Sequence, residues 1–404
     1  ITSAVDPTGG SGSYFYKWQY STSSTFASGV VDINTNDKEL PAEAFTMSGA
    51  DGTVYYFRRA VRDLNASTFY YSTNSIAFTA RSVPSVTAIT VTPSGPLPKG
   101  GTVQVSATTS GTTTLTYNWD KAGGTFANST TAGSASPSIT VPNNGATSWT
   151  PALVVTNTYG CVSPSYSIAT PVTLTDLNAG VLKILSNQTI CEGGTPGLIY
   201  GDASNSSSLP TGGNGYSYTW GTGSGGSFVA LPSSTNMANY QPGVTQVSGS
   251  TNQTSLVFTR RVTSLGVTAD ASITVTVNPL PTIGISVSPS TIAPGGTATL
   301  SGSGGSSYVF KDGAGATVGA SIILTTAGTY TYTAVGTDAN TTCSANSTGS
   351  ATLTVSNVVP GSLTVPTDLD LCIGEKTPAI TSAVDPTGGS GSYFYKWQYS
   401  TSST

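Results

Sequence analysis

Hydrophobic and polar residues alternate along many short runs of the chain. The run TVQVSA places Val103, Val105 and Ala107 on one face, and SITVTV at 272–277 repeats the pattern. Such alternation is typical of β-strands with one buried face, because successive side chains point to opposite sides of a strand. We find no run with the apolar spacing of an amphipathic helix. The pattern therefore predicts an all-β protein made of antiparallel strands.

Clusters of turn-forming residues separate these runs at intervals that suit a β-sandwich. Joints near Pro84, Asn178, Pro279 and Pro360 each lead into a fresh strand. The joints predict pieces of about 80–105 residues, the size of an immunoglobulin-like sandwich. We expect the last piece to begin a domain whose remainder has the sequence of the first piece. The predicted ranges are 1–83, 84–178, 179–278, 279–357 and 358–404.

The chain also repeats itself. Residues Ile1–Thr25 return letter for letter as Ile380–Thr404, which gives a period of 380 − 1 = 379 residues. Self-similarity at a fixed period indicates an array of structural units. We therefore expect a molecule with several near-identical 379-residue units, of which this sequence covers one unit and an overlap.

The predicted ranges fall into two alternating types. Type one carries TICEGG, GGNGYSYTW, FTRRV and ASITVTV in 179–278. It carries LCIGEK, GGSGSYFYKW, YYFRRAV and TNSIAFTA in 358–404 continued by 1–83. Type two contains ITVTPSGPLPKGGTVQVSA in 84–178 and ISVSPSTIAPGGTATLSG in 279–357. The sequence thus predicts a tandem array of immunoglobulin-like sandwiches in which the two types alternate.

Type one resembles the immunoglobulin-like or PKD-like repeats of large surface proteins of Bacteroidota, such as SprB-like gliding adhesins. Those repeats share an ICxG start, a GG-aromatic-x-aromatic-x-W strand, a YYRRV strand and a closing ITVTV strand. The resemblance implies tandem sandwiches at a bacterial cell surface. It says little about function, since such repeats also serve as spacers in secreted enzymes. Family members often carry a second cysteine after the Arg-Arg strand, and neither type-one range has one.

Composition narrows the classes of function. Charged residues make up 8% of the chain and the net charge is −4, which argues against a nucleic-acid partner. The chain has no histidine, the commonest general base and metal ligand. It has no zinc spacing and no phosphate-binding loop, and no apolar run is long enough to span a membrane. We expect neither enzyme activity nor a cofactor or metal site.

Each type-one range pairs a tryptophan with an arginine. Trp18 and Arg59 are 41 residues apart, and so are Trp220 and Arg261. Neighbouring strands would bring one guanidinium per domain close to aromatic rings, where stacking contributes about 0.5–2 kcal/mol. The structural interpretation is a core tryptophan covered by the arginine stem. The functional alternative is an aromatic and cationic platform for sugars.

The four cysteines occupy two kinds of position. Cys191 and Cys372 follow the first strand of type one, whereas Cys161 and Cys343 lie in the last hairpin of type two. In a sandwich array, Cys191 faces the hairpin of the following domain, so we predict a Cys191–Cys343 disulfide. Cys161 and Cys372 would then pair with neighbouring repeat units. Pairing of Cys161 with Cys191 would have to bridge on the order of 70 Å, against a Cα limit of about 7 Å. Disulfides imply an oxidising compartment, and four free thiols remain the alternative.

Trp149, in NNGATSWTP, is the one tryptophan outside the strand pattern. It is either an exposed aromatic contact for a carbohydrate or a cap over its own core.

Together these features favour a structural or adhesive extracellular thread, with a rise of about 150 Å per unit. Its expected partners are neighbouring repeats of the same protein, laterally associated threads, and a glycan or solid surface. The alternatives are a carbohydrate-binding surface module and a spacer array in a large secreted enzyme.

Overall fold

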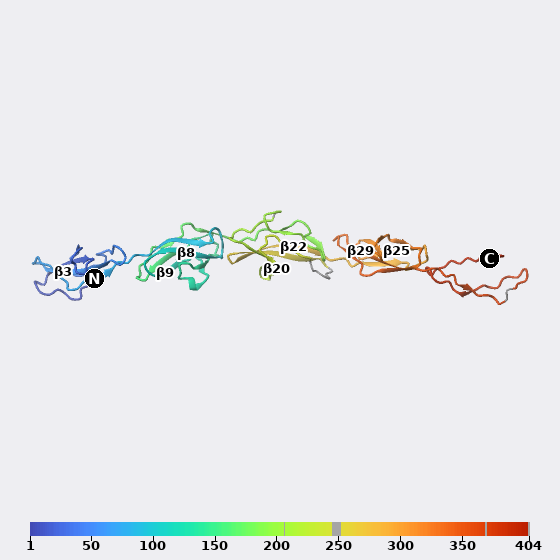
Figure 1. Ribbon diagram of the computed structural model, residues 1–404, viewed down its shortest axis with the longest axis horizontal. Helices are drawn as coiled ribbons and strands as arrows, with labels where there is room; N and C mark the ends of the chain where they lie inside the picture. Colours follow the sequence, from blue (N-terminus) through green and yellow to red (C-terminus); the bar gives the residue numbers. More distant parts are fainter. Residues whose placement is uncertain (206, 245–251, 368–369, 403–404) are drawn as a thin grey trace. The chain divides into compact units, whose positions relative to one another are not determined.

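The computed structural model describes residues 1–205, 207–244, 252–367 and 370–402. Apart from two short 3-10 helices, η1 (Ser129–Thr131) and η2 (Gly225–Ser227), every element in these residues is a β-strand. The all-β class is therefore confirmed (Figure 1). Neither helix in the described part of the chain is long and apolar enough to cross a membrane. The chain forms two compact units, made of 1–179, 210–217 and 261–269, and of 180–209, 218–260 and 270–404.

In the first unit, one five-stranded sheet has the order β2-β1-β3-β4, with β5 also paired to β3. Its strands are β1 (Tyr14–Ser21), β2 (Val31–Ile33), β3 (Val54–Asp63), β4 (Tyr70–Tyr71) and β5 (Ile76–Thr79). The long β1–β3 pairing is antiparallel and places Trp18 opposite Arg59. Trp18 and Phe57 lie at the centre of the core under this sheet.

The rest of the first unit contains two facing layers, seen at the β8 and β9 labels (Figure 1). One layer contains β6 (Ser85–Thr92), β8 (Thr102–Ser110), β10 (Thr125–Phe126) and β11 (Ser138–Thr140). The other contains β9 (Leu115–Asp120), β13 (Ala152–Asn157) and β14 (Tyr166–Ser167). A third sheet contains β7 (Leu97–Pro98), β12 (Ser148–Trp149) and β15 (Val172–Thr175). Val103 and Val105 of β8 meet Leu153 and Val155 of β13 in one core, as the alternation in both strands predicts.

The second type-one range holds a five-stranded sheet of order β17-β22-β21-β19-β20 and a small β16–β18 pair. The strands are β16 (Lys183–Ile184), β17 (Thr189–Cys191), β18 (Ile199–Tyr200), β19 (Ser217–Thr222), β20 (Val229–Thr235), β21 (Thr254–Ser264) and β22 (Val267–Asn278). Trp220, Val262 and Val275 are fully buried here.

The remaining strands belong to the second unit. A three-stranded sheet β23-β25-β28 faces a six-stranded sheet β24-β31-β29-β26-β27, in which β30 also pairs with β29. They are β23 (Gly284–Ser288), β24 (Thr291–Ile292), β25 (Thr297–Ser303), β26 (Ser307–Asp312), β27 (Thr317–Val318), β28 (Ser321–Ile323), β29 (Gly328–Thr337), β30 (Ser344–Asn346) and β31 (Ala351–Val355). One core of ten buried residues lies between the two sheets. The described residues after it contain two strands, β32 (Ser362–Leu363) and β33 (Ser382–Val384), which pair with each other.

One connection recurs three times. A short early strand pairs in parallel with the last strand, as β7 with β15, β17 with β22, and β24 with β31. The recurrence fits tandem immunoglobulin-like sandwiches. In the sheet of residues 1–83, the last strand is β5, and among the described residues it pairs with β3 alone. The boundaries between the predicted ranges stay predictions.

Candidate functional site

The structure joins Cys191 and Cys343 in a disulfide, which is the pair predicted from the sequence. Their Cα atoms are 5.6 Å apart, and 152 positions separate them along the chain. Cys191 is the last residue of β17 and lies opposite Asn278, the last residue of β22. Cys343 is fully buried directly before β30. The bond therefore ties the sheet of 189–278 to the hairpin that ends β29.

Asp338 organises the hairpin that holds Cys343. Its backbone N–H donates to the carbonyl of Cys343 at 2.9 Å. Its Oδ1 accepts from the backbone N–H groups of Asn340 at 3.0 Å and Thr341 at 2.8 Å. These bonds, with that of Thr341 first, hold the pKa of Asp338 below its usual value, because they stabilise the carboxylate form.

This hairpin is expected to loosen in acid. A carboxyl with a lowered pKa stabilises the fold above its unfolded pKa, and that contribution is lost as the pH falls through the lower, folded-state pKa. The amides of Asn340 and Thr341 should therefore lose their hydrogen-bonded NMR shifts as the pH falls through the folded-state pKa of Asp338, which lies below the usual Asp value. Asp338→Asn should remove this pH dependence and keep the hairpin. An unchanged titration in Asp338→Asn would contradict the assignment.

Cys161 lies in a hairpin of the same kind. The backbone N–H of Asn157 donates to the carbonyl of Cys161 at 3.0 Å, and Asn157 Oδ1 accepts from the Cys161 N–H at 2.9 Å. Asn157 thus does with an amide what Asp338 does with a carboxylate. Its Nδ2 also donates to the carbonyl of Ser82 at 3.1 Å, and the Arg81 guanidinium lies 3.9 Å from the ring centre of Tyr159. The hairpin is therefore fastened to the segment that follows β5.

The other two cysteines carry free thiols in this chain. Cys372 is exposed, and Cys161 is half-buried with its Sγ 3.9 Å from the carbonyl oxygen of Arg81. Their predicted pairing with neighbouring repeat units stays a prediction.

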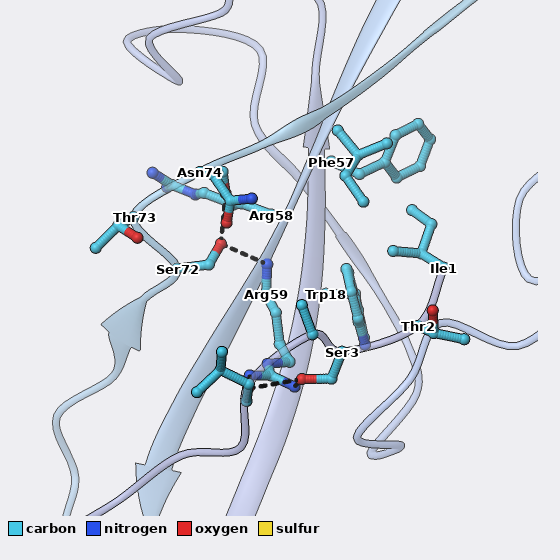
Figure 2. A pocket seen from close by; sticks show the side chains of 13 residues that line it. Ile1, Thr2, Ser3, Trp18, Phe57, Arg58, Arg59, Ser72, Thr73 and Asn74 are labelled. Atoms are coloured by element: carbon cyan, nitrogen blue, oxygen red, sulfur yellow. Dashed lines mark hydrogen bonds between the residues drawn. The ribbon is translucent and has the colours of Figure 1, made fainter.

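Trp18 and Arg59 lie side by side, as the structural interpretation requires. Trp18 is buried, and its indole N–H donates to the carbonyl of Asp37 at 3.1 Å. Arg59 Nη1 donates to Ser3 Oγ at 2.6 Å (Figure 2). The guanidinium carbon of Arg59 lies 5.6 Å from the ring centre of Tyr16. The arginine fixes the segment Ile1–Val5 against the sheet and does not form an open sugar platform.

In the second type-one range the buried arginine is Arg260, so the prediction of Arg261 was wrong. Arg260 is fully buried and lies 5.4 Å from the ring centre of Tyr218, whereas Arg261 is half-buried. Arg260 donates to the carbonyls of Gly201, Ala238 and Ser208. The prediction assumed that the same spacing of 41 residues places the same arginine beside the tryptophan in both ranges. A difference of one residue between two strands moves a side chain to the opposite face of the sheet.

Trp149 is a core residue, so its exposed interpretation was also wrong. It is 1% exposed, and its indole N–H donates to the carbonyl of Lys121 at 2.7 Å. Its ring belongs to the core cluster that contains Trp119 and Leu153. The short strand β12 pairs with β15 and turns the side chain inward. The sequence did not reveal this strand because only two residues of it are paired.

Trp149→Ala is expected to destabilise the range 84–178 by roughly 3–5 kcal/mol, because a large buried side chain leaves a cavity. Trp397→Ala is the matched control, since that side chain is 64% exposed. Hydrogen exchange measured on peptides from β8 and β13 should rise in the first variant alone. Equal exchange in both variants would count against the cap.

A groove of about 620 Å³ lies beside Trp18 in the sheet of residues 1–83. Its walls come from the segment Ile1–Val5, from Phe57 on β3, and from Ile76 on β5 (Figure 2). Figure 2 shows Ile1, Trp18 and Phe57 around the same space, with Arg59 at one end. The described residues contain no group of His, Cys, Asp or Glu that could hold a metal ion. The walls are mixed, with apolar side chains such as Ile1 and Phe57 beside polar ones such as Ser72 and Asn74.

Sequence reasoning missed one surface cluster. The guanidinium of Arg58 lies between two rings, 4.1 Å from the centre of Phe26 and 3.9 Å from that of Tyr71. Phe26 and Tyr71 come from loop and edge positions whose meeting the sequence spacing did not indicate. Such stacking stiffens the outer face of the sheet.

No protein-family model matches this sequence, and no curated protein matches it. Among solved structures it is similar to a three-Ig fragment of titin (12% identity, 68% of this chain and 99% of that one, TM-score 0.28). It is also similar to the D1–D4 ectodomain fragment of ICAM-5 (12%, 75% and 83%, 0.31) and to Drosophila N-cadherin EC1–4 (11%, 87% and 94%, 0.23). These TM-scores are too low to support an argument, so the fold assignment depends on the sheets observed in this chain.

Proposed function

We propose that this protein is a structural and adhesive extracellular thread of tandem immunoglobulin-like domains, at a bacterial cell surface. The observation that carries the proposal is the Cys191–Cys343 disulfide. It crosses the predicted joint at Pro279 and ties strand β17 to a hairpin more than sixty residues beyond that joint. A covalent tie across a joint limits bending and extension, and neither catalysis nor small-ligand binding needs it.

Further features of the chain support the proposal. Repeat arrays contact mainly their own neighbours, so a chain can be lengthened without redesign of each unit. The low charge and the many Ser and Thr side chains give a surface suited to lateral association and to adsorption on glycans or solids. A disulfide supports an oxidising, extracellular location. The resemblance of type one to repeats of Bacteroidota surface proteins points to a SprB-like adhesin or a related filament.

Electron microscopy of material shed from the source cells tests this function. We expect thin filaments with an axial repeat of about 150 Å, or half of that if the two domain pairs look alike. Compact particles without such a repeat would instead favour a spacer array in a large secreted enzyme. The carbohydrate-binding alternative has lost its best candidate, because Trp149 is buried.

A further inference from the structure

We propose that residues 362–367 and 370–372 of a second copy of this repeat dock on the sheet of residues 1–83, where Cys372 of that copy forms a disulfide with Cys161. The inference deepens the proposed function and rests on it, because it names the partner of each unit and the bond that joins them. In the type-one range 179–278, the corresponding segment is paired through β16 with β18 and through β17 with β22.

The receiving edge is β5. Its counterpart β22 is flanked by β21 on one side and by the parallel strand β17 on the other. Among the described residues, β5 pairs only with β3. Phe78 of β5 is 46% exposed, whereas Val275, at the same place in the shared motif, is fully buried. An apolar strand edge of this kind is a template for another strand.

The docking segment is identified by the internal repeat. Residues 361–372 align without gaps with 180–191, so Val365 corresponds to Ile184 and Leu371 to Ile190. Ile184 is 5% exposed and Ile190 is 9% exposed, but Val365 is 74% exposed and Leu371 is 46% exposed. Val365 and Leu371 are therefore exposed, although the matching side chains in 179–278 are buried. Burying such side chains removes apolar surface from water and so favours association.

The groove beside Trp18 fits the same segment. Ile184 pairs with Ile199, and Ile1 occupies the place of Ile199: Leu40 donates its N–H to Ile1 as Tyr240 does to Ile199. Val365 of the second copy would therefore enter next to Ile1, which lines the groove. Residues 380–384 repeat residues 1–5 letter for letter. In its own chain the segment pairs through β32 with β33. Residues 1–5 of the receiving chain have the sequence that contains β33, so they can take its place in this pairing.

The cysteines are aligned by the same register. Cys191 lies opposite Asn278, and Asn278 corresponds to Arg81 when ASITVTVN is placed on NSIAFTAR. A docked Cys372 would therefore lie opposite Arg81. The thiol of Cys161 is already 3.9 Å from the carbonyl oxygen of Arg81. The hairpin around Cys161 has the same backbone bond as the hairpin around Cys343, which is bonded to Cys191.

Bond formation requires an oxidant. The Cys161 thiolate attacks one sulfur of a small disulfide such as oxidised glutathione and releases one glutathione thiolate. The Cys372 thiolate then attacks the mixed disulfide, forms the Cys161–Cys372 bond and releases the second glutathione. Two protein thiols become one disulfide, and one small disulfide becomes two thiols.

Two single variants of the full chain test the proposal. Cys161→Ser keeps Cys372, and Cys372→Ser keeps Cys161. In a glutathione redox buffer, each variant alone should stay monomeric, whereas their mixture should give one covalent dimer and no longer species. The unsubstituted chain should give a ladder of multimers. Peptide mapping should find Cys161 linked to Cys372. Monomers only in the mixture, or dimers of either variant alone, would overturn the proposal.

Docking can be separated from thiol chemistry with a second pair of variants. Leu371→Asp should lower the initial rate of dimer formation by about tenfold or more, because it places a charge at a buried strand position. Val309→Asp, at a similarly exposed site on β26, should leave the rate unchanged. Equal rates would mean random collision of thiols and would reject docking. Shed filaments with the expected axial repeat alongside a failed dimer test would reject this inference and leave the proposed function standing.

Discussion

Arg260→Ala is expected to unfold the second type-one range in a large fraction of molecules. The guanidinium is fully buried and donates hydrogen bonds to three backbone carbonyls. Each buried carbonyl that loses its donor costs about 1–3 kcal/mol, and we expect a total loss of roughly 3–5 kcal/mol. Arg261→Ala should cost about 1 kcal/mol or less, because that side chain is only half-buried.

Hydrogen exchange followed by mass spectrometry is the suitable measurement. A chain with several cores does not unfold in one step, so a single melting temperature would not identify the affected range. Peptides from β21 and β22 should lose protection in Arg260→Ala, while peptides from β8 and β29 keep it. Arg260→Lys should lie in between, since one ammonium can satisfy fewer of the carbonyls. A larger effect of Arg261→Ala than of Arg260→Ala would contradict the corrected assignment.

The disulfide is expected to shield the residues between Cys191 and Cys343 from mechanical load. When the chain is pulled at its two ends, the force passes through the sulfurs and bypasses the residues between Cys191 and Cys343. That loop of 152 residues has a contour of about 500–550 Å at roughly 3.3–3.6 Å per residue. Single-molecule stretching should therefore give a fully extended chain about 500 Å longer after reduction.

Cysteine variants provide the controls for this measurement. Cys343→Ser should give the long contour without reductant, and Cys161→Ser should keep the short one. If oxidised and reduced chains extend to the same length, the disulfide does not form in solution, and the main support for a mechanical role is lost. A short contour of the oxidised chain would mean that the residues between Cys191 and Cys343 carry no load while the rest of the chain extends.

Asp338 and Asn157 hold two similar hairpins, one with a carboxylate and the other with an amide. Both residues accept hydrogen bonds from the backbone of their own hairpin, but only the carboxylate titrates. The amide has a further donor, which reaches the carbonyl of Ser82. The hairpin of Cys161 is thus fastened to the preceding sheet and should be insensitive to pH, in contrast to the hairpin of Cys343.

The sequence by itself determined the class of fold and the partner of one cysteine. Alternation in runs such as 102–107 is a local property that follows from strand geometry, and the strand β8 appears there. The Cys191–Cys343 pair followed from the order of strands, which brings the first turn of one domain to the last hairpin of the next. Neither inference needed the exact register between strands.

Register and burial were decided only by the tertiary structure. A one-residue difference placed Arg260 inside in place of Arg261, and a two-residue strand turned Trp149 inward. The clearest case is the duplicated segment: residues 14–21 form β1 against β3, whereas the identical residues 393–400 form no strand. A strand is held by hydrogen bonds to its neighbour, so the same letters give a strand only where residues such as 54–63 lie beside them.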